Sequence, residues 1–198
     1  MIASAIPVVF SAGADIKEMA DLDFATAYRA DWFAGWDGLT RARTPIVACV
    51  TGYALGGGLE VALGADRRIV GDNAKVGVPE ILLGVIPGGG GTQRLTRLIG
   101  PSKAKDLVFT GRFVGPDEAL RIGLVDEVVA PDEVYNAART WAAQFVDGPA
   151  LALRAAKAAI DAADDLASGL AAEREQFAAL FETEDLAIGM RSFLESGP

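Results

Sequence analysis

The sequence predicts an α/β fold, in which short strands alternate with helices up to residue 130 and helices alone follow. Short apolar runs bounded by glycine, proline or charge are typical of buried strands. Glycine clusters at residues 56–58 and 88–91 each precede a helical pattern. After residue 130, apolar residues recur at helical spacing. We therefore divide the chain into an α/β core, 1–130, and a helical C-terminal region, 131–198.

Composition excludes several classes of protein. With 198 residues, 51% of them hydrophobic and 23% charged, the chain is long enough for one sizeable core. Its formal net charge of -9 argues against a nucleic-acid partner. No apolar run approaches the roughly 20 residues of a membrane-spanning helix, so no membrane partner is expected. The single cysteine, Cys49, excludes intrachain disulfides and fits a cytoplasmic location.

The first third of the chain predicts two strands around one helix. Residues 1–10 are apolar without the basic start of a secretion signal, and they predict a strand. Residues 45–51 predict a short buried strand. Between them, residues 23–43 carry an aromatic stripe at helical spacing, which we assign to core packing. The stripe consists of Phe24, Tyr28, Trp32, Trp36 and Leu39.

The remaining elements follow from local signals. A helix is expected from the glycines 56–58 to residue 65, and another after the glycines 88–91. Proline at a helix start predicts helices at 101–109 and 116–122, and residues 67–70, 74–77 and 124–129 predict strands. Four further helices follow residue 130, the last capped by Thr183. Their apolar surface exceeds what one layer can hide, so we expect contact with another subunit.

Two glutamates are the best candidates for acid–base chemistry. The sequence contains no histidine, so proton transfer near neutral pH falls to a carboxylate, lysine or tyrosine. Glu60 directly follows the first glycine cluster among apolar neighbours, and Glu80 lies in the segment KVGVPEILLG at 75–84. The alternative is that a buried glutamate is a paired charge inside the fold.

The glycine clusters do not match nucleotide-binding motifs. Neither cluster completes G-x-G-x-x-G, and Gly58 stands where a P-loop requires lysine. A glycine run before a helix does expose backbone N–H groups that can bind an oxyanion, although a plain turn is an equal alternative. Residues 11–15 (SAGAD) offer a second set of such groups.

A basic stretch lies beside the second glycine cluster. Between Ile81 and Lys105 there is no acidic residue, which could favour an anionic ligand or could be a solvated helix face. Its cations are Arg94, Arg97, Lys103 and Lys105.

Four ordered motifs point to one family. They are FSAGADIKEM at 10–19, GYALGGGLE at 52–60, PEILLGVIPG at 79–88 and GGTQRLT at 90–96. In this order the chain resembles the enoyl-CoA hydratase/isomerase (crotonase) family. The resemblance implies a crotonase-like spiral of ββα units with a helical C-terminal trimerisation region, and a homotrimer or a dimer of trimers.

The resemblance also implies the site. The backbone N–H groups of Ala14 and Gly57 would form an oxyanion hole, and Glu60 and Glu80 would be the catalytic pair. Glu60 is assigned to the attacking water and Glu80 to the proton delivered to C2. No metal is implied, and coenzyme A is part of the acyl-CoA substrate rather than a separate cofactor. Further substrate-binding positions would be Ala12, Ile16 and Gly88.

The activity implied is enoyl-CoA hydratase, a lyase of fatty acid metabolism that adds water across a 2,3 double bond. An isomerase of the same fold is one alternative, although many isomerases keep mainly the second glutamate. A non-catalytic acyl-CoA-binding subunit is another. Family members usually begin with further strands and a helix that include an Asn-Arg-Pro segment. Nothing here matches that segment, so we expect that the N-terminal part of the core is missing.

Overall fold

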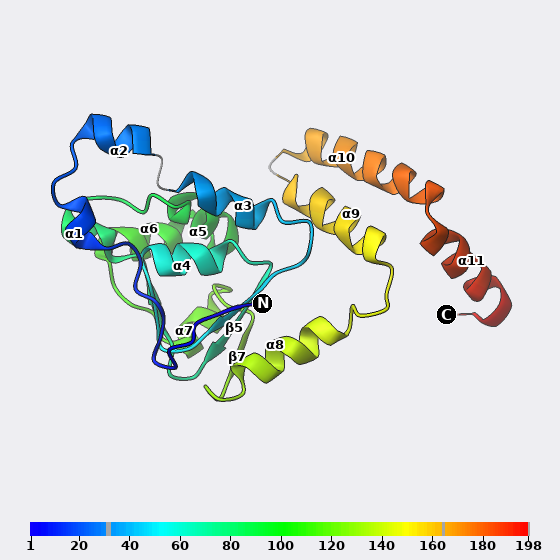
Figure 1. Cartoon of the computed structure of the whole chain (residues 1–198), viewed down its shortest axis with the longest axis horizontal. Coiled ribbons are helices and arrows are strands. Elements are labelled where there is room, and N and C mark those ends of the chain that lie inside the picture. The colour runs from blue at the N-terminus through cyan, green and yellow to red at the C-terminus, as the bar shows by residue number, and fades with distance from the viewer. Residues whose placement is uncertain (31–32, 164, 198) are drawn as a thin grey trace. The chain divides into compact units, whose positions relative to one another are not determined.

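Two parallel β-sheets and the helices packed on them form the larger part of the structure (Figure 1). The computed structural model describes residues 1–30, 33–163 and 165–197. It divides into a first unit, Met1–Ala42 with Ile46–Trp141, and a second unit, Arg43–Pro45 with Ala142–Pro198. The division at residue 130 that we drew from the sequence stays a prediction.

Successive strands alternate between the two sheets. The four-stranded sheet has the order β1-β3-β5-β7, and the three-stranded sheet has the order β2-β4-β6. Each strand pair therefore contributes one strand to each sheet before the chain turns into a helix, which is the predicted ββα spiral. The strands are β1 (Ile2–Ala3), β2 (Val9–Ser11), β3 (Val47–Val50), β4 (Tyr53–Leu55), β5 (Arg67–Gly71), β6 (Lys75–Gly77) and β7 (Glu127–Val129).

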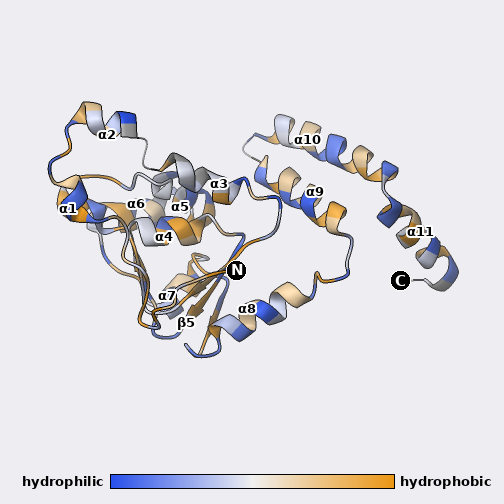
Figure 2. Cartoon of the chain, in the orientation of Figure 1, coloured by the Kyte–Doolittle hydropathy of each residue, from blue (hydrophilic) through white to orange (hydrophobic). Residues whose placement is uncertain are grey.

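Helices α4 (Gly57–Leu63), α5 (Gly91–Ile99) and α6 (Pro101–Thr110) pack in sequence order, α4 on α5 and α5 on α6. Proline at the first position of α6 and of α7 (Pro116–Arg121) confirms both predicted starts. The core beneath them is apolar (Figure 2), and its largest fully buried side chains include Leu59, Leu95 and Leu107.

Two sequence-based expectations for the N-terminal part are wrong. Residues 1–10 do not form one strand, because a turn after Ser4, whose Oγ accepts a hydrogen bond from the Ile6 N–H (3.0 Å), separates β1 from β2. Residues 23–43 do not form one helix but α2 (Phe24–Ala30), a 3-10 turn η1 (Ala34–Trp36) and α3 (Asp37–Thr40).

The aromatic stripe does not pack into the core as predicted. Phe24 and Tyr28 are 83% and 77% exposed and stack on each other with ring centroids 5.7 Å apart. Trp36 and Leu39 are only half-buried, and Trp32 lies outside the described residues. Helical spacing identified an apolar face, but it could not show what covers that face.

Helices follow residue 130, as predicted, and apart from Arg43–Pro45 they make up most of the second unit. They are α9 (Ala150–Asp161), α10 (Leu166–Ala179), a 3-10 turn η3 (Leu180–Glu182) and α11 (Glu184–Ser196); α8 (Val134–Ala143) precedes them and packs in the first unit through Val134 and Ala138. Thr183 caps α11 by accepting the Leu186 N–H at 3.3 Å.

Candidate active site

The three-stranded sheet brings the predicted site segments to one edge. Its strands are parallel, with Ser11 of β2 opposite Ala54 of β4, and Leu55 of β4 opposite Gly77 of β6. All three strands therefore end at the same edge, where polar groups from successive loops can converge. The chain leaves β2 towards Ala14, β4 towards Gly57 and Glu60, and β6 towards Glu80.

Glu60 is held by a backbone donor from the second glycine cluster. It lies in the first turn of α4 and is 2% exposed. Its Oε1 accepts a hydrogen bond from the Gly91 N–H at 2.6 Å, and this bond is buried. This hydrogen bond from a backbone amide fixes the orientation of the Glu60 carboxyl group at the sheet edge.

The two proposed oxyanion donors lie in neighbouring segments. A Cβ on Gly13 would stand only 3.0 Å from the Gly57 nitrogen, so the 11–15 loop lies directly against the start of α4. Ser11 Oγ accepts the Gly13 N–H (3.3 Å), and Asp15 Oδ1 accepts the Lys17 N–H (2.8 Å) to cap α1 (Ile16–Met19). These bonds constrain the peptide on each side of Ala14.

Glycine at position 58 is required by this close approach. A Cβ there would overlap the backbone carbonyl of Ser11, so only a residue without a side chain lets the 11–15 loop reach α4.

Glu80 has a different environment from Glu60. It lies in the 3-10 turn η2 (Pro79–Leu83), where its Oε1 is 2.9 Å from the position a Gly56 Cβ would take. Its Oε2 is buried and accepts no hydrogen bond from any described residue. Burial raises the pKa of the Glu80 carboxyl, and the negative charge of Glu60 raises it further. The Glu80 carboxyl thus holds its proton to a higher pH than an ordinary glutamate does.

The three further predicted substrate positions lie near the surface. Ala12 and Gly88 are exposed, and Ile16 is 52% exposed. Ala12 and Gly88 lie in loops around the site, and Ile16 is the first residue of α1. The contact of these three residues with a substrate stays a prediction.

Two aromatic residues, Phe33 and Trp36, lie at the site, and the sequence analysis did not place either of them there. A Cβ on Gly57 would stand 2.8 Å from Cη2 of Trp36, and a Cβ on Gly89 would stand 2.8 Å from its Cε3. Phe33 meets Trp36 edge-on, with centroids 5.0 Å apart, and lies against Gly88. We had assigned Trp36 to core packing, and its helical spacing held no signal that distinguishes the two roles.

Within the described ranges, no cluster of three or more His, Cys, Asp or Glu side chains could hold a metal ion. Among the helices of those same residues, none is long and apolar enough to cross a membrane.

Comparisons with known proteins identify the family of the chain. The family model for enoyl-CoA hydratase/isomerase matches residues 1–198. The chain belongs to the enoyl-CoA hydratase/isomerase family. It is 52% identical over 188 residues to a probable enoyl-CoA hydratase of Mycobacterium tuberculosis, covering 94% of this chain and 73% of that protein. It is 49% identical over 187 residues to a probable enoyl-CoA hydratase of Rhizobium meliloti, covering 93% and 73%.

The crotonase fold is also shown by solved structures. An enoyl-CoA hydratase subunit from Geobacillus kaustophilus superposes with a TM-score of 0.91 at 43% identity, covering 96% of this chain and 75% of that one. The predicted family and fold class are therefore confirmed.

Glu80→Gln is expected to change how stability depends on pH. A carboxyl whose folded pKa is raised binds more protons in the folded state, so its stabilising contribution is lost as pH rises from the ordinary value, 4.5, through the folded pKa. Glutamine does not ionise, so the variant does not lose stability in this way as pH rises. We expect it to unfold at higher urea concentration than wild type above the folded pKa of Glu80, and at a similar concentration at pH 4.

Glu118→Gln is the matched control. Arg112 donates to Glu118 at 2.7 Å and lowers its pKa, so the stabilisation is present above the ordinary value and lost as pH falls. This variant should lose stability at neutral pH. If both variants shifted stability in the same direction, the environment assigned to Glu80 would be incorrect.

Proposed function

We propose that this protein is an enoyl-CoA hydratase that adds water across the 2,3 double bond of an enoyl-CoA thioester. The observation that carries the proposal is the contrast between two carboxyl groups at one sheet edge. Glu60 accepts a backbone hydrogen bond at 2.6 Å, whereas Glu80 keeps a buried oxygen without a partner in the described structure. Pairs of carboxyls in contrasting environments are how acid and base roles are divided.

In the proposed reaction the carboxylate of Glu60 takes a proton from water as the water oxygen bonds to C3. The electrons of the double bond move towards the thioester oxygen, where the amides of Ala14 and Gly57 stabilise the negative charge. Glu80 then gives its proton to C2. The net change is the addition of one water molecule, and a proton passes from Glu60 to Glu80 before the next cycle.

The test is turnover of a short enoyl-CoA in water labelled with oxygen-18. A hydratase places the label at C3 and removes the absorbance of the conjugated thioester. An isomerase moves the double bond without taking up the label, and a non-catalytic acyl-CoA-binding subunit shows affinity without turnover. Retention of Glu60 favours hydration, since isomerisation requires no activated water.

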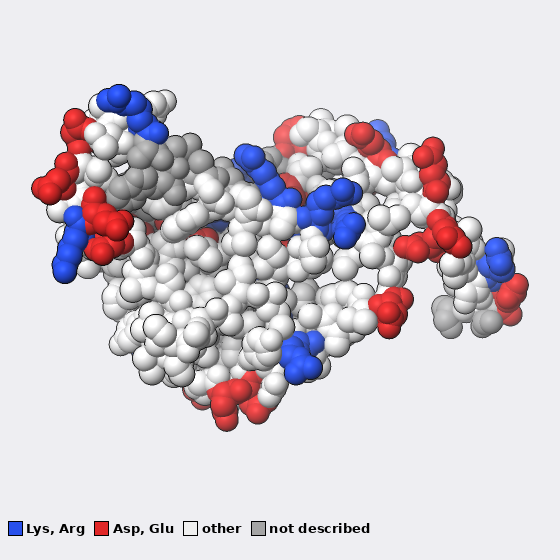
Figure 3. Space-filling view, viewed as in Figure 1, with Lys and Arg blue, Asp and Glu red and all other residues white. Residues whose placement is uncertain are grey.

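We also propose that the C-terminal helices hold the protein as a homotrimer or a dimer of trimers. The helices of the second unit expose many large apolar side chains, which is unusual for a surface that meets only water. These are Phe177, Phe181, Ile188, Met190, Phe193 and Leu194. The first unit also presents a broad uncharged area, bordered by both acidic and basic residues, in the view of Figure 3.

Sedimentation tests this assembly. We expect the wild-type protein to sediment as a trimer or hexamer at micromolar concentration, and Phe193→Asp to shift the distribution towards monomer because a buried charge is costly. Glu195→Gln, an exposed polar neighbour, should leave it unchanged. A stable wild-type monomer would exclude the proposal.

The proposed partner is an acyl-CoA, with coenzyme A entering only as part of the substrate and without a separate cofactor or metal. The proposed setting is the cytoplasm and fatty acid metabolism.

A further inference from the structure

The side chain of Arg94 folds back over the start of its own helix. Arg94 lies in the first turn of α5, and its Nη1 donates to the carbonyl oxygen of Gly89 at 2.6 Å. Gly90, between them, is left-handed with φ 100°, and a Cβ there would overlap Nη1. The turn thus has room for the guanidinium only because residue 90 is glycine.

This placement runs against the charge of the helix end. The N-terminus of a helix carries partial positive charge, so a cation beside it is disfavoured unless another interaction compensates. The Gly89 carbonyl, immediately before the helix, is one acceptor that compensates here. The N-cap residue of α5, Gly90, has no side chain to cap the helix, so the glycine segment 88–91 depends on other anchors to hold one conformation.

The same segment binds one oxygen of Glu60 and lies beside the other. The Gly91 N–H binds Oε1 at 2.6 Å, and a Cβ on Gly89 would stand 2.8 Å from Oε2. The carbonyl that accepts from Arg94 and the amide that donates to Glu60 are therefore separated by one residue, Gly90. A change in the Gly89 carbonyl direction would turn the Gly91 amide away from the carboxylate.

We propose that Arg94 is a positioning residue for Glu60, acting through the Gly89–Gly91 turn. The inference rests on the proposed hydratase activity and adds to it a residue that acts through the backbone of the 89–91 turn. Of the four cations in the basic stretch, Arg94 thereby gains a role other than binding an anionic ligand.

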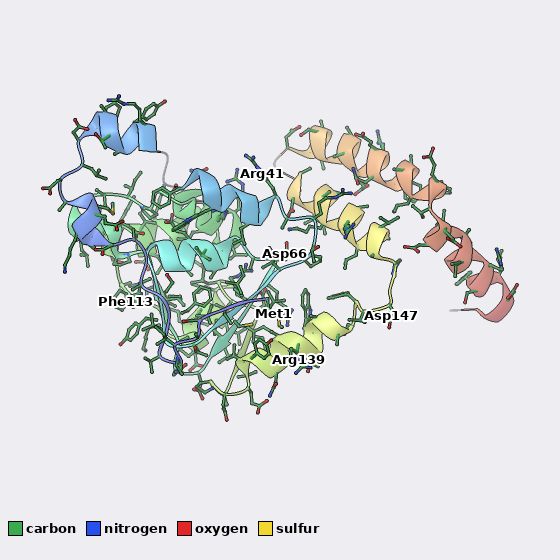
Figure 4. The ribbon with its side chains drawn as sticks, in the orientation of Figure 1. Met1, Arg41, Asp66, Phe113, Arg139 and Asp147 are labelled. Carbon is green, nitrogen blue, oxygen red and sulfur yellow. The ribbon has the colours of Figure 1, made fainter. Side chains whose placement is uncertain are left out.

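The first test compares Arg94→Met, Arg94→Lys and a surface control, Arg139→Met (Figure 4), in hydration of a short enoyl-CoA. Misplacing a catalytic group by about 1 Å can cost roughly 10²-fold in rate. We expect Arg94→Met to lower kcat by about 10- to 100-fold with KM within about twofold, and Arg94→Lys to recover part of the loss. Arg139→Met should match wild type. An unchanged kcat in folded Arg94→Met would overturn the proposal.

A double-mutant cycle separates positioning from general loosening of the fold. If Arg94 acts by orienting Glu60, then Arg94→Met should cost less than about twofold in a Glu60→Gln background. A loss equal to that in the wild-type background would refute the proposal. Should Arg94→Met not fold, Arg94→Lys supplies the same cycle, because lysine keeps the charge but not the guanidinium's directed N–H groups.

A crystal structure of Arg94→Lys or Arg94→Met gives a result that does not need activity. In Arg94→Met we expect the distance from the Gly91 nitrogen to Glu60 Oε1 to lengthen beyond hydrogen-bond range, and in Arg94→Lys we expect it to lengthen less. An unchanged 2.6 Å contact would overturn the positioning role even in an active enzyme. If instead the wild-type protein failed to hydrate any enoyl-CoA, the proposed function would be wrong. The distance from the Gly91 nitrogen to Glu60 Oε1 in the variants would still decide whether Arg94 positions Glu60.

Discussion

Glu60→Gln and Glu80→Gln should each lower kcat for hydration of a short enoyl-CoA by about 10²- to 10⁴-fold, the usual contribution of a general acid or base. Both variants should remain folded. Glutamine keeps an oxygen that can accept the Gly91 N–H in place of Glu60. At position 80 it removes a charge whose burial is unfavourable. Steady-state kinetics with circular dichroism checks both statements.

The two variants should differ in a second measurement. Exchange of the C2 hydrogens of a saturated acyl-CoA with deuterium oxide needs only the group that serves C2, so it should be lost in Glu80→Gln and largely kept in Glu60→Gln. Glu118→Gln, which removes a carboxylate paired with Arg112, is the control for both assays. Near-native hydration by both glutamine variants would contradict the catalytic pair, and the reverse exchange pattern would exchange their roles.

Gly57→Pro should reduce kcat by about 10²- to 10³-fold, the typical cost of one lost oxyanion donor. Gly57 is the first residue of α4, where proline is tolerated because its missing N–H has no partner within the helix. The substitution therefore removes the proposed donor while the helix can persist. Kinetics on folded protein, verified by urea unfolding, supplies the measurement.

Gly57→Ala isolates the steric part of that effect. It keeps the N–H, but its methyl group would stand 2.8 Å from Cη2 of Trp36, so the indole must move. We expect a smaller loss than for proline, and partial recovery when Trp36→Leu is added. In a crystal with an acyl-CoA analogue, the thioester oxygen should lie roughly 2.7–3.1 Å from the amides of Ala14 and Gly57. Full activity of Gly57→Pro, or an oxygen bound elsewhere, would be incompatible with the oxyanion hole.

Most of the first unit could be predicted from local sequence signals. Apolar runs between glycines located β3, β5 and β6, and the prolines at 101 and 116 located two helix starts. These signals are local because a buried strand or a helix cap is specified by a few adjacent residues. The prediction of one helix packed into the core was wrong for residues 23–43. An aromatic stripe shows which face of a helix is apolar but not what packs against it, and here Phe24 and Tyr28 stack on each other.

The candidate site shows the same limit. The family motifs named Glu60, Glu80, Ala14 and Gly57, and the parallel sheet explains why three separate loops meet. The hydrogen bond from Gly91 to Glu60 joins residues 31 positions apart, and the bond from Arg94 depends on the direction of a long side chain. Neither hydrogen bond can be predicted from the spacing of residues in the sequence, since both depend on tertiary packing and on side-chain rotamers.

Strand β4 is the middle strand of the three-stranded sheet, so its length sets where the site groups lie relative to one another. It hydrogen-bonds to β2 on one side and to β6 on the other, and Gly57 and Glu60 follow it directly. Loss of one residue from β4 would shift these groups by about 3.3 Å against both neighbouring loops and turn its side chains to the opposite face. Chain length in this one strand therefore controls the distance from the base to the acid and from each amide to the other.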